Sequence, residues 1–372
     1  MKILVICNTY DIGGAGKAAA RSARCIQSIP GVSVIYWALT DTRRSPHRFV
    51  EEKGNAYTKF RAHVSSLLSR LIKSKEVESI NLFPTFYARK INNSDFDLVI
   101  IHWVGSGAMS LKDIDNINLP VFIVHHDEWF SLPSSHYECT TRPRYWFDDL
   151  LIKQKRRILK KCTNIFPSRW LRDRFEKRAL SFNAKHLPNV YEPEIYNRDH
   201  SSVDRTKSGS TKVLFCAMPA EFAGRKGGHL LAPLVQQSIA TNSNNEFYVI
   251  GGKSKLSNVT SLGYVASEKE LAKILNSVDV CIVPSKLDNF PNVALEALAC
   301  GTPVITCKNS GTHEMFMHSG MGIISEPTAN DLLNAINNIK VAMHHPEKLA
   351  LQTLNAFGPD NYKKKFVKLV EN

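Results

Sequence analysis

Two acidic residues, Asp288 and Glu296, are spaced so that both could hold hydroxyl groups of one ligand. Asp288 lies in a short polar loop that follows the apolar run Val280–Pro284. Glu296 lies in an Ala- and Leu-rich stretch that predicts a helix starting near Pro291 and ending at Gly301. Burying an unpaired carboxylate is costly, so Glu296 needs a partner. That partner is either an internal cation or the hydroxyls of a ligand bound at the carboxyl edge of a parallel sheet.

Two basic residues, Arg225 and Lys226, precede a predicted helix in the same half of the chain. Cations beside the positive end of a helix favour a diphosphate group. The alternative for this pair is a solvated position on the surface.

A glycine-rich loop with Gly13, Gly14 and Gly16 follows the first predicted strand. Glycines allow backbone N–H groups and a helix N-terminus to approach phosphate or sugar oxygens closely. The loop is not a Walker A motif, because Asp11 and Ala18 replace required residues. Gly14 and Gly16, together with an acidic residue near the end of the second strand, Asp41, fit a dinucleotide fingerprint. An NAD-dependent oxidoreductase is therefore one alternative.

Histidines follow two other predicted strands. His126 stands in the segment His126-Asp127-Glu128-Trp129, just after an apolar run. Polar residues at the carboxyl end of a parallel strand point into the ligand crevice. His102 ends the preceding predicted strand, where lining the crevice and packing in the core are equally good interpretations.

Strand-like runs alternate with helical patterns along the chain, which predicts an α/β fold with parallel sheets. The predicted strands of the first half are Lys2–Cys7, Val32–Ala38, Leu98–Trp103, Val121–His125 and Thr163–Pro167. Those of the second half are Lys212–Ala217, Glu246–Ile250, Val280–Pro284 and Pro303–Thr306. We expect a first domain over residues 1–190, a polar linker over 191–211, a second domain over 212–355 and a terminal helix over 356–372. A cleft between two such domains is a common ligand site.

The net charge of +14 indicates an anionic partner. The basic residues are dispersed and form no nucleic-acid recognition motif, so we expect no nucleic acid. The segments Thr58–Lys75 and Lys153–Lys161 read as basic amphipathic helices, which fit either an anionic membrane surface or ordinary surface helices. With no apolar run of membrane-spanning length, we expect a cytoplasmic protein, with peripheral contact to the inner face of the plasma membrane.

The segment Asp-Asn-Phe-Pro-Asn-Val-Ala-Leu-Glu-Ala-Leu-Ala-Cys-Gly-Thr-Pro-Val, which starts at Asp288, resembles the E-x7-E signature of glycosyltransferase family 4. It is most similar to the exopolysaccharide and O-antigen (colanic-acid-type) branch. Asp288 departs from the usual Glu by one methylene. His126-Asp-Glu-Trp129 resembles the H-D-x-W segment of the same branch, and Arg225-Lys226-Gly227 resembles its R-K-G segment.

This resemblance implies a GT-B architecture: two doubly wound Rossmann-like domains, an interdomain cleft and a last helix that crosses back to the first domain. It implies that Glu296 holds the ribose of a nucleotide donor and that Asp288 contacts the donor sugar. His126 would lie beside the reacting sugar, which completes the catalytic set. The implied donor-binding set is Gly13, Gly14, Gly16, Arg225, Lys226, Phe290, Asn292, Glu296, Gly311 and Glu314.

The function expected from these features is that of a retaining glycosyltransferase. It would move a hexose-type sugar from a nucleotide diphosphate donor to a saccharide hydroxyl, on a free or lipid-linked acceptor, in surface polysaccharide synthesis. We expect no cofactor and no metal, since the Asp-x-Asp pairs at 95–97 and 113–115 are poorly placed for ligands. A sugar-nucleotide-binding relative without catalysis is a further alternative.

Overall fold

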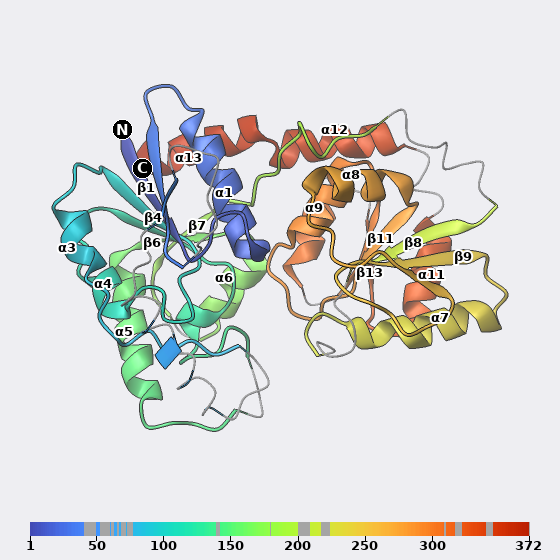
Figure 1. Ribbon diagram of the computed structural model, residues 1–372, viewed down its shortest axis with the longest axis horizontal. Coiled ribbons are helices and arrows are strands. Elements are labelled where there is room, and N and C mark those ends of the chain that lie inside the picture. The colour runs from blue at the N-terminus through green and yellow to red at the C-terminus, as the bar shows by residue number, and fades with distance from the viewer. Residues whose placement is uncertain are drawn as a thin grey trace. The chain divides into compact units, whose positions relative to one another are not determined.

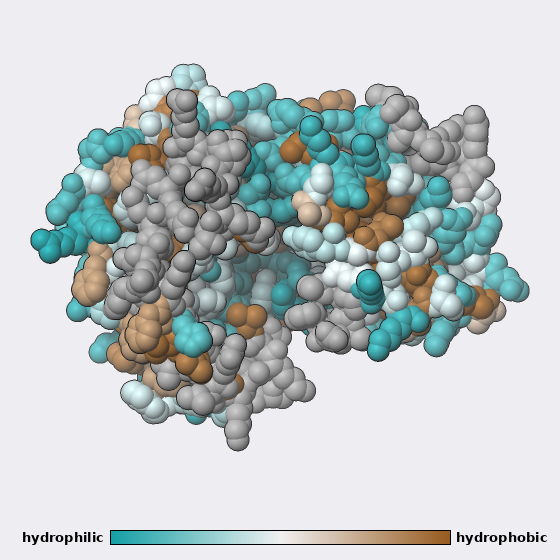
Figure 2. All heavy atoms as spheres, viewed as in Figure 1, coloured by the Kyte–Doolittle hydropathy of each residue, from teal (hydrophilic) through white to brown (hydrophobic). Residues whose placement is uncertain are grey.

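The computed structural model describes residues 1–40, 50–52, 60, 63–64, 67, 72, 77–138, 142–178, 180–199, 209–216, 224–308, 310–316, 322–339 and 345–371. The chain divides into two compact units, Met1–Val190 with Tyr362–Asn372, and Tyr191–Asn361. Each unit has its own parallel sheet (Figure 1), with a hydrophobic core on each face of that sheet. Hydrophilic residues cover much of the described surface in Figure 2, with hydrophobic residues in small groups between them.

The first unit contains a seven-stranded parallel sheet. In order across the sheet, its strands are β3 (Val50–Glu52), β2 (Ser33–Ala38), β1 (Lys2–Cys7), β4 (Leu98–Ile101), β5 (Val121–Val124), β6 (Thr163–Phe166) and β7 (Asn183–His186). Strand order runs outward in both directions from β1 and β4. The carboxyl ends of these two strands therefore form the switch point at which open α/β sheets bind ligands.

Helices cover both faces of this sheet (Figure 1). They are α1 (Gly13–Gln27), α3 (Tyr87–Asn92), α4 (Leu111–Asp115), α5 (Asp148–Lys161), α6 (Arg169–Glu176) and α13 (Pro359–Glu371). Side chains of β1 alternate between two cores, as the pleat of a strand requires. Leu4 and Ile6 pack in the core that includes α3, α4, α5 and α6, whereas Ile3 and Val5 pack in the core that includes α1 and α13.

The last helix belongs to this first unit from Tyr362 onward. Tyr362 and Phe366 of α13 are buried in the same core as the alanines of α1. This is the crossover expected for the last helix, although the helix begins at Pro359, and α12 of the second unit extends to Phe357.

The second unit contains a six-stranded parallel sheet with the same type of strand order. Its strands are β10 (Val259–Ser261), β9 (Asn245–Val249), β8 (Thr211–Phe215), β11 (Val280–Val283), β12 (Val304–Cys307) and β13 (Gly322–Ser325). Its helices are α7 (Leu231–Ala240), α8 (Glu268–Ser277), α9 (Asn292–Ala299), α11 (Ala329–Ile339) and α12 (Pro346–Phe357). One core joins the sheet to α8, α9 and α12, and the other joins it to α7 and α11. The switch point of this sheet lies between β8 and β11.

These two sheets confirm the predicted α/β fold of two doubly wound units. Every strand expected from the sequence is present, with ends that differ by no more than two residues. Four strands were missed: β3, β7, β10 and β13. They are short and lack a strong apolar pattern; in β10, for example, Val259 is buried while the next two residues are exposed. Asp41 and most of the segment Thr58–Lys75 lie outside the described residues.

Candidate active site

The basic pair of the second unit lies at the switch point of its sheet. Arg225 and Lys226 follow β8, and Lys286 N, which follows β11, donates a hydrogen bond to Arg225 O at 2.8 Å. Gly227 makes this approach possible: its φ is +76°, and a Cβ there would lie 2.2 Å from the carbonyl oxygen of Pro284. A side chain at this position is therefore excluded, both by its conformation and by the lack of space.

Lys226 and Asp288 form an ion pair across this switch point. Lys226 Nζ lies 2.5 Å from Asp288 Oδ2. Burial alone would raise the pKa of the Asp288 carboxyl, but Lys226 and then Arg225 outweigh it, so the pKa lies below its usual value. Arg225 itself donates to the carbonyl oxygen of Leu287 at 3.0 Å. The structure thus brings together three of the predicted site residues.

Glu296 lies in the second turn of α9 and is 2% exposed. The helix begins at Asn292 with Pro291 as its N-cap, one residue later than predicted, and Gly301 follows its end with a φ of +68°. The thiol of Cys216, at the end of β8, has a pKa well above its usual value because of a hydrogen bond with Cys281, burial, and the nearby charges of Cys281 and Glu296. Glu296 is therefore close to the thiol of Cys216, which directly follows β8.

The remaining predicted donor residues of this unit occupy different environments. Gly311 N donates to the backbone oxygen of Asp288 at 2.7 Å, which joins the turn after β12 to the acidic loop. Glu314 is buried in that same turn. Asn292 is half-buried in the first turn of α9. Phe290, in contrast, packs in the core against Phe357, with ring centroids 5.6 Å apart. Its ring therefore anchors the loop that carries Asp288 to the core.

A buried hydroxyl beside these residues was missed in the sequence. Among the described residues, Thr312 Oγ1 is a buried oxygen without a hydrogen-bond partner, and it follows Gly311 directly. Thr312 lies within the Gly-Thr-His-Glu segment, so its place in that motif was the available signal.

The glycine loop of the first unit lies after β1, beside the carboxyl end of β4. Gly13 and Gly14 open α1 and are exposed, and a Cβ at either position would meet no atom within 4 Å. Gly16 is buried against Thr9. The N-cap of α1 is Ile12, whose apolar side chain cannot accept the N–H groups of the first turn. The open space at Gly13 and Gly14 leaves room for a ligand to approach the backbone closely.

The two histidines after β5 have opposite environments. His125 is 2% exposed, bonds Asn164 Oδ1 at 2.9 Å and lies against Phe166 in the core. His126 is half-buried, and its Nε2 lies 2.9 Å from Nδ1 of the buried His102. His126 is therefore the more exposed of the two histidines that follow β5, and His102 contacts its buried side.

A second series of hydrogen-bonded side chains holds Asp127, the residue that follows His126, in place. Asp127 Oδ2 lies 2.6 Å from His136 Nδ1 and accepts from Trp103 Nε1 at 3.0 Å. His136 Nε2 in turn lies 2.7 Å from Ser79 Oγ. This Ser79–His136–Asp127 order is that of a hydrolase triad, but Ser79 is fully buried and also accepts from a backbone N–H, so it is a structural support. This series of hydrogen bonds could not be predicted from the sequence, because Ser79, Asp127 and His136 come from separate segments.

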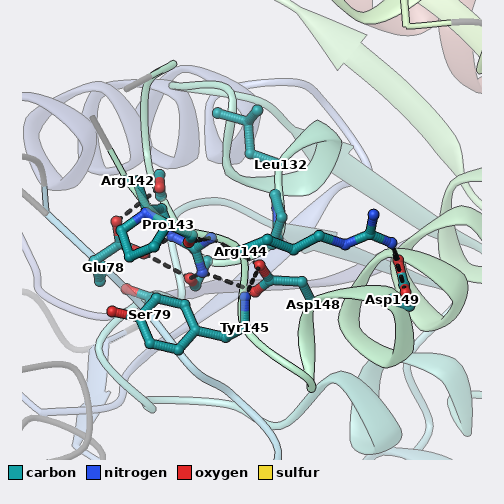
Figure 3. A network of polar contacts seen from close by, with 12 residues as sticks. Glu78, Ser79, Leu132, Arg142, Pro143, Arg144, Tyr145, Asp148 and Asp149 are labelled. Atoms are coloured by element: carbon teal, nitrogen blue, oxygen red, sulfur yellow. Dashed lines mark hydrogen bonds and ion pairs between the residues drawn. The ribbon is translucent and has the colours of Figure 1, made fainter. Parts of the chain in front are cut away.

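Buried ion pairs hold the loop that carries His136 (Figure 3). Arg142 contacts Asp148 Oδ1 at 2.7 Å and Glu78 Oε2 at 3.3 Å. Ser134 and Ser135 also donate to the Glu78 carboxylate, at 2.5 and 2.7 Å. These contacts tie the stretch before α3 to the start of α5.

Over the described ranges, no group of three or more His, Cys, Asp or Glu side chains is arranged to hold a metal ion. The two Asp-x-Asp pairs have structural contacts: Asp97 accepts from the Lys2 backbone at 2.7 Å, and Asp113 accepts from the Thr85 backbone at 2.7 Å. Nor does any helix of the described residues have the length and apolar character needed to cross a membrane.

Part of the second unit is similar in sequence to known glycosyltransferases. Residues 211–340 match the family model described as Glycosyl transferases group 1. Over 185 residues the chain is 25% identical to the putative colanic acid biosynthesis glycosyl transferase WcaC of Escherichia coli (strain K12), which covers 47% of this chain and 44% of that protein. Over 84 residues it is 38% identical to the uncharacterized glycosyltransferase MJ1607 of Methanocaldococcus jannaschii, which covers 23% of this chain and 20% of that protein. The matches thus span less than half the length of these relatives.

Solved structures extend the similarity of fold to the whole chain. A sucrose-phosphate synthase from Thermosynechococcus elongatus has a TM-score of 0.71 at 15% identity, covering 100% of this chain and 98% of that one. Anabaena Alr3699/HepE in complex with UDP and glucose has a TM-score of 0.69 at 15% identity, covering 100% and 99%. WaaG, a glycosyltransferase involved in lipopolysaccharide biosynthesis, has a TM-score of 0.59 at 14% identity, covering 98% and 99%.

The fold is therefore that of the GT-B glycosyltransferases. The second unit contains the region that matches the glycosyl transferases group 1 model, in agreement with the resemblance to family 4 seen in the sequence.

Proposed function

We propose that this protein is a retaining glycosyltransferase that uses a nucleotide diphosphate sugar as donor and a saccharide hydroxyl as acceptor in surface polysaccharide synthesis. The observation that carries the proposal is the Lys226–Asp288 ion pair at the switch point of a group 1 domain, with Glu296 buried close to the thiol of Cys216, which directly follows β8. The ion pair supplies a cation for the diphosphate and a carboxylate for sugar hydroxyls within one small region.

In the proposed reaction, the bond from the anomeric carbon to the diphosphate oxygen breaks, and a bond to the acceptor oxygen forms on the same face of the sugar. The acceptor proton passes to the leaving phosphate oxygen. Arg225 and Lys226 stabilise the negative charge of the departing diphosphate. Glu296 accepts hydrogen bonds from the ribose, and Asp288 from the donor sugar. His126 orients the sugar or stabilises positive charge on it.

The nucleotide and sugar can be found by measuring thermal unfolding with a panel of nucleotide sugars. A ligand that binds only the folded state at 100 times its Kd stabilises the protein by about 2.7 kcal/mol. We expect a small number of donors to raise Tm, and one of them to support transfer or slow donor hydrolysis. A nucleotide sugar that raises Tm but is neither transferred nor hydrolysed would instead favour the alternative of a sugar-nucleotide-binding protein without catalysis. If a nicotinamide dinucleotide raised Tm and no nucleotide sugar did, the result would favour the oxidoreductase hypothesis. That hypothesis gives Asp288 and Glu296 no role.

We further propose that α5 contacts an anionic membrane, which would bring the enzyme to a lipid-linked acceptor at the cytoplasmic face. Trp146, just before α5, is 89% exposed, and Leu150 in its first turn is 53% exposed. An open groove along the helix is lined by Asp149, Ile152, Lys153, Arg156, Arg157 and Lys160. Exposed Trp and Leu beside several cations form the usual pattern of a helix that lies in the membrane interface.

Co-sedimentation with vesicles tests this contact. We expect binding to vesicles that contain anionic phospholipid, weak binding to zwitterionic vesicles, and a clear loss of binding for Leu150→Ser. Leu351→Ser is the matched control, because Leu351 is 58% exposed in the second unit. Equal binding of both variants and the wild type would remove α5 from the proposal.

A further inference from the structure

The contact between His102 and His126 has the geometry of an in-line hydrogen bond. His102 Nδ1 and His126 Nε2 are 2.9 Å apart, the ring centroids are 5.2 Å apart, and the planes differ by 22°. The N···N line thus runs along the line between two nearly coplanar rings. At its other end, His102 Nε2 lies 3.3 Å from the hydroxyl of Ser22 on α1.

Both rings are neutral near pH 7. Burial lowers the pKa of His126 to about 4, although Asp127 partly offsets the effect. Burial, followed by the charge of His126, lowers the pKa of His102 well below its usual value. A neutral imidazole has one N–H donor and one acceptor nitrogen, so one of the two facing nitrogens carries the shared proton.

Ser22 decides which nitrogen carries it. The Ser22 hydroxyl donates to the backbone oxygen of Ala19 at 2.9 Å, and that oxygen can only accept. Because its one proton is used, Ser22 Oγ accepts from His102, and His102 carries its proton on Nε2. His102 Nδ1 is then an acceptor, so the facing Nε2 of His126 is the donor. Nδ1 of His126 is left with a free lone pair.

This lone pair is open to a ligand. Within the described part of the chain, Nδ1 of His126 makes no hydrogen bond, and it is not among the buried unsatisfied atoms. The ring is half-buried at the carboxyl edge of the sheet, after β5, and β4 separates this strand from β1 and its glycine loop.

We propose that Ser22 and His102 are positioning residues that hold His126 as its Nε2–H tautomer, so that Nδ1 accepts a hydrogen bond from a hydroxyl of the bound sugar. The tautomer follows from the contacts alone, whereas its use by a sugar rests on the proposed function. A neighbour that fixes one ring nitrogen in this way determines what the other nitrogen can do.

The tautomer can be measured without any substrate. Long-range ¹H–¹⁵N correlation spectra of protein with ¹⁵N-labelled histidine rings distinguish Nδ1–H, Nε2–H and charged forms, and His102→Asn and His126→Asn provide the assignments. We expect the Nε2–H pattern for both residues at pH 7.5. Ser22→Ala should turn His126 into a mixture of the two neutral tautomers. Ser28→Ala is the matched control, because its hydroxyl also donates to a carbonyl of α1, that of Cys25 at 2.7 Å.

An Nδ1–H or charged His126, or a Ser22→Ala spectrum identical to wild type, would overturn the proposal. The second measurement is transfer rate. His102→Leu, which cannot accept from His126, should lower kcat about tenfold or more with KM for the donor unchanged. His102→Asn keeps a side-chain carbonyl oxygen and should recover most of kcat. Full kcat in His102→Leu contradicts the positioning role. An absence of donor binding and transfer by the wild type would instead contradict the proposed function while leaving the tautomer measurable.

Discussion

The two units have the same kind of fold but support their candidate site residues in different ways. In the second unit, a single loop and helix carry Asp288 and Glu296, and one neighbouring turn adds Lys226. In the first unit, a histidine at the sheet edge depends on buried polar groups from distant segments. The same parallel α/β fold can therefore position candidate site residues in two ways: with residues close together in the sequence, or with buried polar residues from distant segments.

Buried charge is the clearest sign of this difference. Lys155 is fully buried in the first unit, where its Nζ donates to the carbonyl oxygens of Trp129, Leu132 and Pro133 at 2.5, 2.9 and 2.9 Å. Burial lowers the pKa of this lysine well below its usual value. Glu128 is also fully buried and pairs with Arg174 of α6 and with Arg178, two residues beyond that helix. The loop after β5 is thus held by charges that become costly if a partner is lost.

The largest expected effect on this network comes from Arg142. Its side chain is 7% exposed and contacts Glu78 and Asp148, which are equally buried (Figure 3). Arg142→Met leaves two buried carboxylates without their cation and should lower the free energy of unfolding by about 3–5 kcal/mol. Arg144→Met is the control, because Arg144 and Asp149 are 75% and 78% exposed. It should change stability by less than about 0.5 kcal/mol.

Tryptophan fluorescence during urea unfolding measures this effect in the first unit specifically. All five tryptophans, Trp37, Trp103, Trp129, Trp146 and Trp170, lie in that unit. Equal loss of stability in the Arg142 and Arg144 variants would show that the network is not the support described here.

Acid should weaken the first unit through its buried histidines. Burial lowers the pKa of His125 to about 4, partly offset by the hydrogen bond to Asn164. The unfolded chain binds that proton near pH 6.5, so the free energy of unfolding should fall as the pH drops from about 6.5 to about 4. One such histidine contributes on the order of 3 kcal/mol over this range.

His125→Gln stays neutral at every pH and should reduce the slope of stability against pH between 6.5 and 4.5. The measurement is again urea unfolding followed by tryptophan fluorescence. An unchanged slope would mean that His125 takes up its proton equally well in the folded and unfolded chain.

The smallest of these effects is expected for Lys226 in the second unit. Lys226→Ala should weaken binding of a nucleotide diphosphate sugar about tenfold, because it removes one charge-assisted contact to phosphate. Lys269→Ala, an exposed position on α8, is the control and should bind like the wild type. Isothermal titration calorimetry gives both affinities. Identical values for the two variants would show that Lys226 does not bind the diphosphate.

Prediction from the sequence followed the same division between the units. The loop and helix around Asp288 and Glu296 were predictable because strand, proline, glycine stop and next strand are contiguous in the chain. His126 was predictable from its position after a strand. The residues behind it were not: Ser22 lies on α1, Ser79 before α3 and His136 after β5, and only the fold brings them together. Phe290 lies inside the motif, yet its ring faces the core, because a loop that presents Asp288 also needs an apolar anchor.

The most direct test of the central claim is donor binding and transfer by Glu296→Gln, with the exposed Glu270→Gln on α8 as control. The substitution keeps the shape of the side chain and removes the charge that would accept two ribose hydroxyls. We expect Glu296→Gln to keep the unliganded Tm, to bind the donor about 100-fold more weakly, and to show no measurable transfer, while Glu270→Gln behaves like the wild type. Wild-type affinity and wild-type transfer rate in Glu296→Gln would contradict the account.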